Sequence, residues 1–237
     1  MKVLENAIAG SNIITKAILS GLSTQMGLAG KDRFENSHRN HRASSSTLAM
    51  MHYIPSDPVT DKNIGHQKHT DISSLTLLFS EQWGLQIRPP GKPVTHPNYS
   101  STIADMYPGA KEFGFVAPKV GTAIVNVGDS LRFASGHTMA SCIHRVVPLN
   151  PDEHRYSIAY FLRAENETQF TDSSGRAVTA GQWHDEKFYT FTAPPEMQAA
   201  APSYLLLGGM EEEADLSKAQ LVEKENLAGN QTAVAAH

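Results

Sequence analysis

The first candidates for chemistry are His69 and Asp71, which are separated by one residue. On a β-strand alternate side chains share a face, so this imidazole and this carboxylate would point the same way. Both groups suit a borderline divalent ion such as Fe(II), Mn(II) or Zn(II). The pattern is short and arises often by chance, so a surface histidine and aspartate flanking a strand is the competing interpretation.

A second histidine and a polar pair extend this pattern. His144 lies in the apolar run Cys142–Val147, where a core position would normally hold valine or isoleucine, so it is either a ligand or a satisfied core histidine. Eleven residues later, Arg155 and Ser157 again share a strand face, and they offer a planar fork and a hydroxyl to a carboxylate. An unpaired inward arginine is costly to bury, so Arg155 either faces solvent or binds an anion.

The composition narrows the class of protein. A chain of 237 residues with 40% hydrophobic residues fits one sizeable domain with a buried core. Its single cysteine, Cys142, excludes an internal disulfide and a cysteine-based zinc site. We expect Cys142 to be a small buried side chain and not a nucleophile. Any bound metal must therefore be held by nitrogen and oxygen.

The charge distribution argues against several partners. Residues 211–237 hold six acids and two bases, whereas residues 1–210 hold 18 groups of each sign. A neutral body lacks the basic stripe that nucleic acids require, so we expect no nucleic-acid partner. Apolar runs stay below the roughly 20 residues that span a bilayer, and the first ten residues lack a signal-peptide pattern. We expect a cytoplasmic protein without a membrane partner.

The hydrophobic pattern predicts the elements that must hold these residues. Met1–Gly27 is predicted to be one long amphipathic helix, with an apolar face made of Val3, Leu4, Ile8, Ile14, Ile18, Leu22 and Met26. Seven short apolar segments predict strands: Leu48–Ile54, Ser74–Phe79, Leu85–Arg88, Ala123–Val127, Ser130–Phe133, Cys142–Val147 and Tyr156–Leu162. Short strands with few helices between them favour an antiparallel sandwich or jelly roll, hence a mainly β fold with flanking helices.

The remaining segments are predicted to be connections and helices. Lys31–Ser46 predicts a solvated loop, Asn126–Asp129 a turn between two strands, and the proline-rich Pro89–Pro118 a long loop of functional or disordered type. Gln182–Tyr189 and Asp215–Leu227 predict short helices. We divide the chain into an N-terminal helix and loop (1–46), a jelly-roll core (47–165), a C-terminal segment (166–210) and an acidic tail (211–237).

Several motifs together resemble a known family. His69-Thr-Asp71 is followed by Leu75-Thr-Leu-Leu78 and Gly84-Leu-Gln86, then by Val125-Asn-Val-Gly-Asp129, Ser141-Cys-Ile-His-Arg-Val146 and Arg155-Tyr-Ser157. In order and approximate spacing this stretch is similar to the iron(II)/2-oxoglutarate-dependent dioxygenases, in their isopenicillin N synthase-like branch. Gln182-Trp-His-Asp-Glu-Lys-Phe188 and Gly208-Gly-Met210 resemble the fungal members, which commonly serve secondary metabolism.

The resemblance assigns roles residue by residue. It implies that His69, Asp71 and His144 hold Fe(II), that Arg155 and Ser157 bind the distal carboxylate of 2-oxoglutarate, and that Tyr53 hydrogen-bonds this cosubstrate or only fills the barrel wall. The implied fold is a double-stranded β-helix. The implied activity couples decarboxylation of 2-oxoglutarate by dioxygen, giving succinate and carbon dioxide, to hydroxylation, desaturation or rearrangement of a small molecule. The resemblance also allows ascorbate as a reductant.

The other histidines are predicted to have simpler places. His66 should face away from His69 on a continuing strand, and His137 should lie in a loop, where the family resemblance also allows a substrate contact. Six further histidines are predicted to lie at the surface: His38, His41, His96, His154, His184 and His237.

The sequence departs from the family at its beginning, where we expect most of the usual N-terminal region to be absent. We expect a short member, a truncated sequence, or a chain whose open barrel edge is covered by a partner or a second copy. Two alternatives to the oxygenase therefore stay open. One is an iron oxidase of the same fold in which Arg155 and Ser157 hold the substrate's own carboxylate. The other is a non-catalytic metal-binding or interaction protein.

Overall fold

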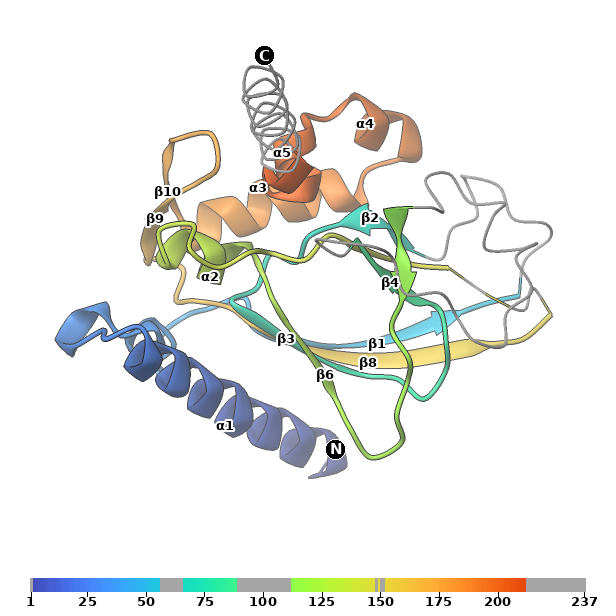
Figure 1. The fold of residues 1–237 in the computed structure, drawn as a ribbon, viewed down its shortest axis with the longest axis horizontal. Helices are drawn as coiled ribbons and strands as arrows, with labels where there is room; N and C mark the ends of the chain where they lie inside the picture. The colour runs from blue at the N-terminus through green and yellow to red at the C-terminus, as the bar shows by residue number, and fades with distance from the viewer. Residues whose placement is uncertain (1, 56–65, 89–111, 148, 150–151, 212–237) are drawn as a thin grey trace, which may run out of the picture.

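The computed structural model describes residues 2–55, 66–88, 112–147, 149 and 152–211 (Figure 1). The predicted helix Asp215–Leu227, nearly all of the acidic tail and most of the Pro89–Pro118 segment lie outside the described residues.

Two four-stranded antiparallel sheets face each other and form the body of the fold (Figure 1). One sheet has the strand order β1-β8-β3-β6, and the other has the order β2-β7-β4-β5. The bounds are β1 Thr47–Tyr53, β2 His66–His69, β3 Leu75–Phe79, β4 Leu85–Ile87, β5 Gly114–Phe115, β6 Ile124–Val127, β7 His144–Val146 and β8 Arg155–Leu162. This is the predicted jelly roll, or double-stranded β-helix.

Six of the seven predicted strands are confirmed: β1, β3, β4, β6, β7 and β8. The seventh, Ser130–Phe133, is wrong, because these residues belong to helix α2, Asp129–Ala134. Alternation over four residues cannot separate a strand from a short buried helix. The Asn126–Asp129 turn therefore leads from a strand into a helix. The short strands β2 and β5 were not predicted because they carry few apolar residues.

The first helix, α1 (Lys2–Gln25), confirms the predicted element but not its inner face. Its buried residues are Ser11, Thr15, Leu19 and Ser23, spaced four apart, whereas Val3, Leu4, Ile8 and Ile14 are exposed. Small polar side chains let the helix approach its neighbours: Thr15 donates to the Ser11 carbonyl within the helix at 2.7 Å, and Ser23 donates to Glu35, beyond the helix, at 2.9 Å.

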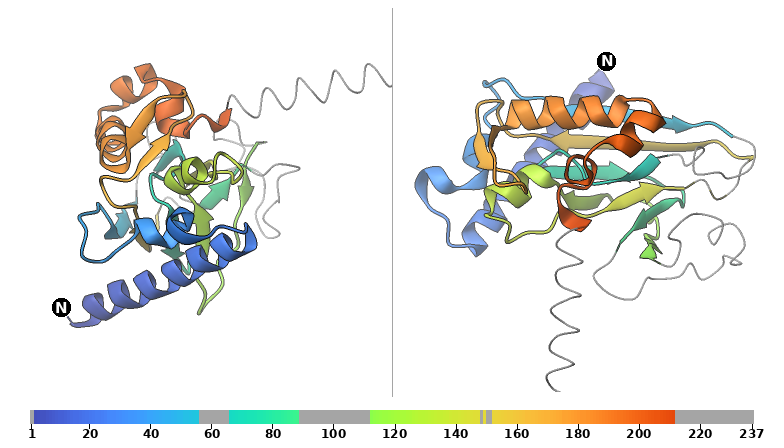
Figure 2. Two further views of the ribbon diagram at one scale, coloured as in Figure 1. Left: turned by 90° about the vertical axis from the view of Figure 1, so that its left-hand side faces the viewer. Right: turned by 90° about the horizontal axis from the view of Figure 1, so that it is seen from above.

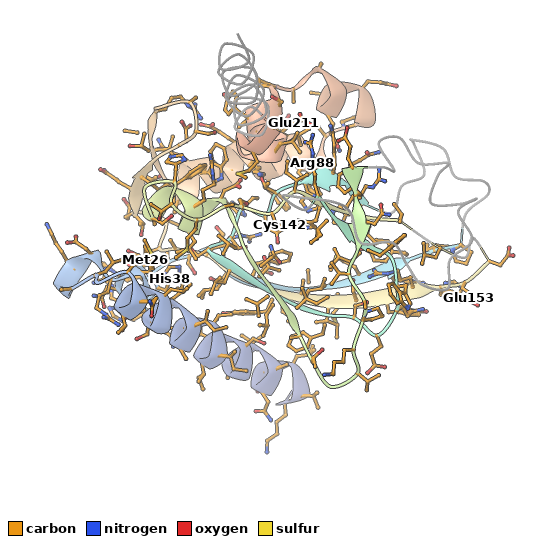
Figure 3. The ribbon with its side chains drawn as sticks, viewed as in Figure 1. Met26, His38, Arg88, Cys142, Glu153 and Glu211 are labelled. Atoms are coloured by element: carbon orange, nitrogen blue, oxygen red, sulfur yellow. The ribbon has the colours of Figure 1, made fainter. Side chains whose placement is uncertain are left out.

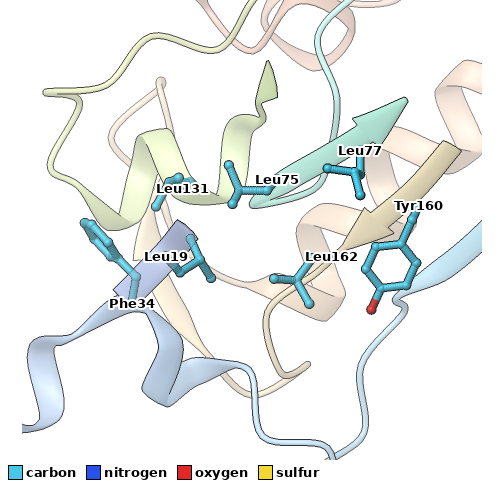
Figure 4. Close-up of a cluster of buried hydrophobic side chains, with 7 residues drawn as sticks. All are labelled: Leu19, Phe34, Leu75, Leu77, Leu131, Tyr160 and Leu162. Carbon is cyan, nitrogen blue, oxygen red and sulfur yellow. The ribbon is translucent and has the colours of Figure 1, made fainter. Parts of the chain in front are cut away.

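The core between α1 and the first sheet is a cluster of seven buried side chains (Figure 4). Its members come from α1, the 3₁₀ turn η2 (Phe34–Ser37), β3, α2 and β8: Leu19, Phe34, Leu75, Leu77, Leu131, Tyr160 and Leu162. Each large apolar side chain buried here contributes roughly 1.5–3 kcal/mol, so this cluster fixes the sheet whose other face carries Arg155 and Ser157.

The C-terminal segment forms a second layer over the other sheet. After the hairpin β9 (Gln169–Thr171) and β10 (Ala177–Thr179) come α3 (Ala180–Thr192), α4 (Pro195–Ala200) and α5 (Ser203–Leu207). Thr179 and Gln182 form a capping box that starts α3, and α3 includes the predicted Gln182–Tyr189. Figure 2 shows α3 running lengthwise along the strands, and α5 contacts β2. None of the helices in the described ranges combines the length and apolarity needed to cross a bilayer.

Candidate metal centre and anion pocket

Three of the predicted ligands meet at one point between the sheets. His69 ends β2, Asp71 lies just beyond it, and His144 begins β7 directly opposite His69 in the strand register. Their ligand atoms all lie within 4.8 Å of one another. The Nε2 atoms of both histidines lie 3.5 Å from Asp71 Oδ1. Among the described residues, this is the one group of three or more such side chains that could hold a metal ion.

Hydrogen bonds turn each ligand toward the common centre. The Nδ1 atom of His69 lies 2.7 Å from the Gln67 carbonyl, and that of His144 lies 3.0 Å from the Cys142 carbonyl. A carbonyl can only accept, so each Nδ1 carries the proton and each Nε2 keeps its lone pair for a metal. Asp71 is oriented through its other oxygen, Oδ2, which accepts from Thr76 at 2.6 Å and from Asn126 at 2.8 Å.

The charge states of these groups suit a divalent cation. Burial alone would raise the pKa of Asp71, but His144, His69 and the Asn126 amide hold it well below its usual range. Burial lowers the pKa of His144, and the neighbouring His69 acts in the same direction. The centre therefore offers one ionised carboxylate and neutral imidazole nitrogen, which metal binding requires.

Arg155 and Ser157, on β8, form a second polar group in the same space. Arg155 Nε donates to the Trp83 carbonyl at 2.9 Å and Nη2 donates to Ser80 at 3.1 Å. The buried Nη1 of Arg155 and the buried hydroxyl of Ser157 have no hydrogen-bond partner in the described part of the chain. No carboxylate in those residues pairs with this arginine either, although buried charges are normally paired.

Tyr53 completes this group from the neighbouring strand. It is the register partner of Arg155, whose guanidinium carbon lies 4.9 Å from the centre of the tyrosine ring. Burial raises the pKa of the Tyr53 hydroxyl, and the positive charge of Arg155 opposes that rise. Burial in turn lowers the pKa of Arg155. These groups form an apolar-walled pocket that keeps one guanidinium nitrogen, Arg155 Nη1, available to a carboxylate ligand.

Two motif glycines allow the chain to pass close to these residues. Gly84 has φ +133°, and a Cβ there would lie 2.8 Å from Arg155 Nε and 2.8 Å from the Val147 carbonyl oxygen. A Cβ on Gly128 would lie 2.1 Å from the Ser73 carbonyl oxygen. Both positions therefore require glycine, one behind the anion pocket and one behind the metal ligands.

The two polar groups line one cavity of about 600 Å³, counted with its open mouth. Its wall also includes Met51, Leu78, Ile87, Ile124, Phe161 and Cys142. Figure 3 shows Cys142 in the space between the two sheets. Cys142 is half-buried and not fully buried as predicted, and burial raises the pKa of its thiol to about 11.

His66 also lines this cavity, so the prediction that it faces away from His69 is wrong. The two ring centres are 4.8 Å apart, because the register between β2 and β7 shifts between these residues and breaks the strand alternation. Phe191 of α3 packs against both rings, at 4.9 Å from His66 and 4.8 Å from His69. No pattern in the neighbouring sequence predicts that His66 lies beside His69 or that Phe191 packs against both rings.

The surface prediction for His38 is also wrong. This side chain is buried, lies beside α1 in Figure 3, and bonds the Phe34 carbonyl and the Ser74 hydroxyl, both at 2.8 Å. Burial lowers its pKa to about 4. Most of the surrounding loop is exposed, as predicted, and its Arg39 pairs with the buried Glu165 at 2.6 Å. His41 and His154 are exposed and His184 is half-buried, whereas His96 and His237 lie outside the described residues.

His137 stands apart from the cavity. It has φ +63°, is exposed, and its Nε2 lies 3.3 Å from the Thr171 carbonyl oxygen. It is not among the residues that line the cavity, so the suggested substrate contact has no geometric support in the described residues.

Comparisons with known proteins agree with this geometry. The profile of the 2OG-Fe(II) oxygenase superfamily matches residues 45–164. The chain is 45% identical over 208 residues to the 2-oxoglutarate-dependent dioxygenase iboH of Amanita muscaria, and the match covers 86% of this chain and 91% of that protein. It is 46% identical over 198 residues to the oxidoreductase vrtI of Penicillium aethiopicum, where the match covers 82% of this chain but only 43% of the relative.

A solved structure shares the fold. A Neurospora crassa protein, crystallised with alpha-KG and thymine, superposes with a TM-score of 0.55 at 23% identity. The match covers 76% of this chain and 53% of that one. The chain thus spans about half the length of several proteins that it matches, while it spans nearly all of iboH.

Proposed function

The chain belongs to the 2OG-Fe(II) oxygenase superfamily, and we propose that it oxidises a small-molecule substrate with Fe(II), 2-oxoglutarate and dioxygen. The proposed iron ligands are His69, Asp71 and His144. Two neutral imidazoles and one carboxylate on one side of a metal form the donor set of non-haem Fe(II) oxygenases, and they leave positions open for other ligands. Support comes from the convergence of their ligand atoms within 4.8 Å.

The observation that carries the proposal is the pair of unpartnered buried donors across the same cavity, Arg155 Nη1 and Ser157 Oγ. A carboxylate there would accept from both donors and neutralise the buried guanidinium. We assign these two residues to the distal carboxylate of 2-oxoglutarate, with Tyr53 beside them. A dicarboxylic ketoacid suits the cavity because one end carries a cation-binding group and the other carries an anion-binding group.

Each residue then has a defined task. When bound, iron and 2-oxoglutarate supply the activation of dioxygen for oxidation of a substrate C–H bond. The protein orients the ligands through the Gln67 and Cys142 carbonyls, holds the cosubstrate at Arg155, and excludes water with the apolar walls of the cavity. Hydroxylation is the expected outcome, and desaturation or rearrangement requires only another substrate pose. Similarity to dioxygenases of fungi supports a role in secondary metabolism.

The proposal is tested by anaerobic titration of the protein with Fe(II) and 2-oxoglutarate. Bidentate binding of a ketoacid to Fe(II) produces a visible charge-transfer band, which we expect only when protein, iron and 2-oxoglutarate are all present. Oxygen should then yield succinate. Iron binding and oxygen uptake without succinate would favour the oxidase that does not use 2-oxoglutarate. A folded chain that binds no iron at micromolar concentration would favour the non-catalytic alternative.

A further inference from the structure

The two C-terminal motifs meet behind the turn that carries His69 and Asp71. In α3, Trp183, Lys187 and Phe191 are spaced four residues apart and therefore lie on one face of the helix. Trp183 is fully buried, and Phe191 packs against the ring of His69. Between them, Lys187 is only 1% exposed, and a lysine at such a depth must be paired.

Lys187 has two partners, and both are tied to the metal ligands. Its Nζ lies 2.5 Å from Asp129 Oδ2 and 2.6 Å from Thr70 Oγ1. Thr70 is the middle residue of His69-Thr-Asp71, and unlike the two ligands it does not line the cavity. The backbone N–H of Asp129 donates to the Asp71 carbonyl at 2.8 Å. The ammonium group thus holds both the residue between the ligands and the residue that supports Asp71.

Residues at the end of α5 and just after it contact the same region around Thr70 and Asp129. The N–H of Thr70 donates to the Leu206 carbonyl at 3.0 Å, and Arg132 Nη1 donates to the Gly208 carbonyl at 2.6 Å. Gly208 has φ +57°, and a Cβ there would lie 2.4 Å from Asp129 Oδ1 and 2.9 Å from Thr70 Oγ1. Two segments that are separate in the sequence, one with Lys187 and one with Gly208, therefore both contact the side chains of Thr70 and Asp129.

Stability is a poor reason to bury such an ion pair. Well-packed apolar residues of similar volume commonly replace buried ion pairs without loss of stability. An apolar side chain at position 187 could not, however, donate a hydrogen bond to Thr70. In metal sites, the groups that orient the ligands typically change metal affinity by about 10–100-fold when they are removed.

We propose that Lys187 is a positioning residue of the iron site, which acts through Asp129 and Thr70 to hold the His69–Asp71 turn in its metal-binding geometry. This inference rests on the proposed function. It makes the C-terminal segment part of the metal centre, although it contributes no ligand.

The test compares Fe(II) affinity in three proteins: the unchanged chain, Lys187→Met and Glu186→Gln. Glu186→Gln is the matched control, because it removes the exposed ion pair of Glu186 with Arg176 from the same helix. We expect Lys187→Met to weaken anaerobic Fe(II) binding about 10–100-fold and to shift the charge-transfer band, whereas the control keeps both. Unchanged affinity and an unchanged band in a folded Lys187→Met protein would overturn the inference. Absence of iron binding in the unchanged chain would instead refute the proposed function, and this inference with it.

A double variant separates positioning from folding. Asp129→Asn with Lys187→Met removes both buried charges, so we expect the thermal stability lost in Lys187→Met to recover, but not the iron affinity. Recovery of both together would show that the pair serves only the fold. If Lys187→Met does not fold, Thr70→Val decides the question, since it removes the hydroxyl and keeps the shape. Weaker iron binding in Thr70→Val supports the inference, and unaltered binding overturns it.

Discussion

The two ends of the cavity differ in how complete they are without a ligand. At the metal end, the oxygens and nitrogens that face away from the centre are all engaged: both Nδ1 atoms with carbonyls and Asp71 Oδ2 with two donors. At the arginine end, Nη1 of Arg155 and the hydroxyl of Ser157 are buried without a partner in the described residues. The metal end therefore presents lone pairs to a cation, whereas the arginine end presents hydrogen-bond donors to an anion.

This difference indicates which end depends on which ligand. The metal end needs a cation to join three preoriented groups, whereas the arginine end needs an anion to satisfy two donors that are otherwise costly to bury. Damage at the arginine end should therefore weaken 2-oxoglutarate binding and spare Fe(II) binding, whereas damage at the metal end should weaken Fe(II) binding and every step that depends on it. The predictions below use this separation.

The largest effect is expected for His69→Ala. Loss of one of three ligands should lower Fe(II) affinity and succinate formation by more than about a hundredfold, which exceeds the effect of removing a supporting group. The measurement is iron bound per chain together with succinate formed. His41→Ala removes an exposed histidine and serves as the control. Full activity in His69→Ala would remove the basis of the iron assignment.

A smaller effect is expected at the other end, for Arg155→Gln. A hydrogen bond to a charged group contributes about 1.5–3 kcal/mol, so the concentration of 2-oxoglutarate needed for half-saturation should rise about 10–100-fold. Fe(II) affinity measured without 2-oxoglutarate should stay unchanged. An equal loss of iron binding would show that the two ends are not independent.

Acid should destabilise the chain through its buried histidines. His38 has a pKa of about 4 in the folded chain, against 6.5 when exposed, so the unfolded chain binds the proton first as the pH falls. Above pH 6.5 His38 is neutral in both the folded and the unfolded chain, so it causes no loss of stability. Between pH 6.5 and 4 its protonation in the unfolded chain lowers the free energy of unfolding by about 3 kcal/mol in total. The cavity histidines add losses of the same sign: burial lowers the pKa of His66 to about 3 and also lowers the pKa of His144.

The variant His38→Gln separates these two sources of acid sensitivity. Unfolding by denaturant across this pH range, with metal removed, should give a shallower decline for the variant than for the unchanged chain. The part of the remaining slope that comes from the metal ligands should be opposed by added metal, since protons and metal compete for the same nitrogens. Equal slopes in the two proteins would contradict the role assigned to His38.

The smallest effect is expected for Gly84→Ala. The new Cβ would press on Arg155 Nε and on the Val147 carbonyl, in a backbone conformation that costs about 1–3 kcal/mol for other residues. Gly121→Ala is the control, because Gly121 also has a positive φ, of +74°, but nothing within 4 Å of its Cβ position. Gly84→Ala should weaken 2-oxoglutarate binding, while Gly121→Ala should affect stability alone. Equal 2-oxoglutarate affinities would contradict the close contact.

The residues of both ends could be found from the sequence because their patterns are local. His69 and Asp71 are two residues apart, as are Arg155 and Ser157, and His144 stands out in an apolar strand. Six strands were predicted for the same reason, since alternation over four to eight residues is visible without tertiary contacts. The predictions that were wrong depend on distant partners: α1 buries small polar residues against the core, and His38 bonds to Ser74.

By itself, the sequence determined the chemical groups of the site, their order, and a jelly roll to carry them. Only the tertiary structure decided how those groups are used. A register shift turned His66 into the cavity, burial left two donors of Arg155 and Ser157 without partners, and α3 brought Lys187 against Thr70 across more than a hundred residues. Strand alternation follows from the backbone alone, whereas burial and pairing depend on which distant segment covers each side chain.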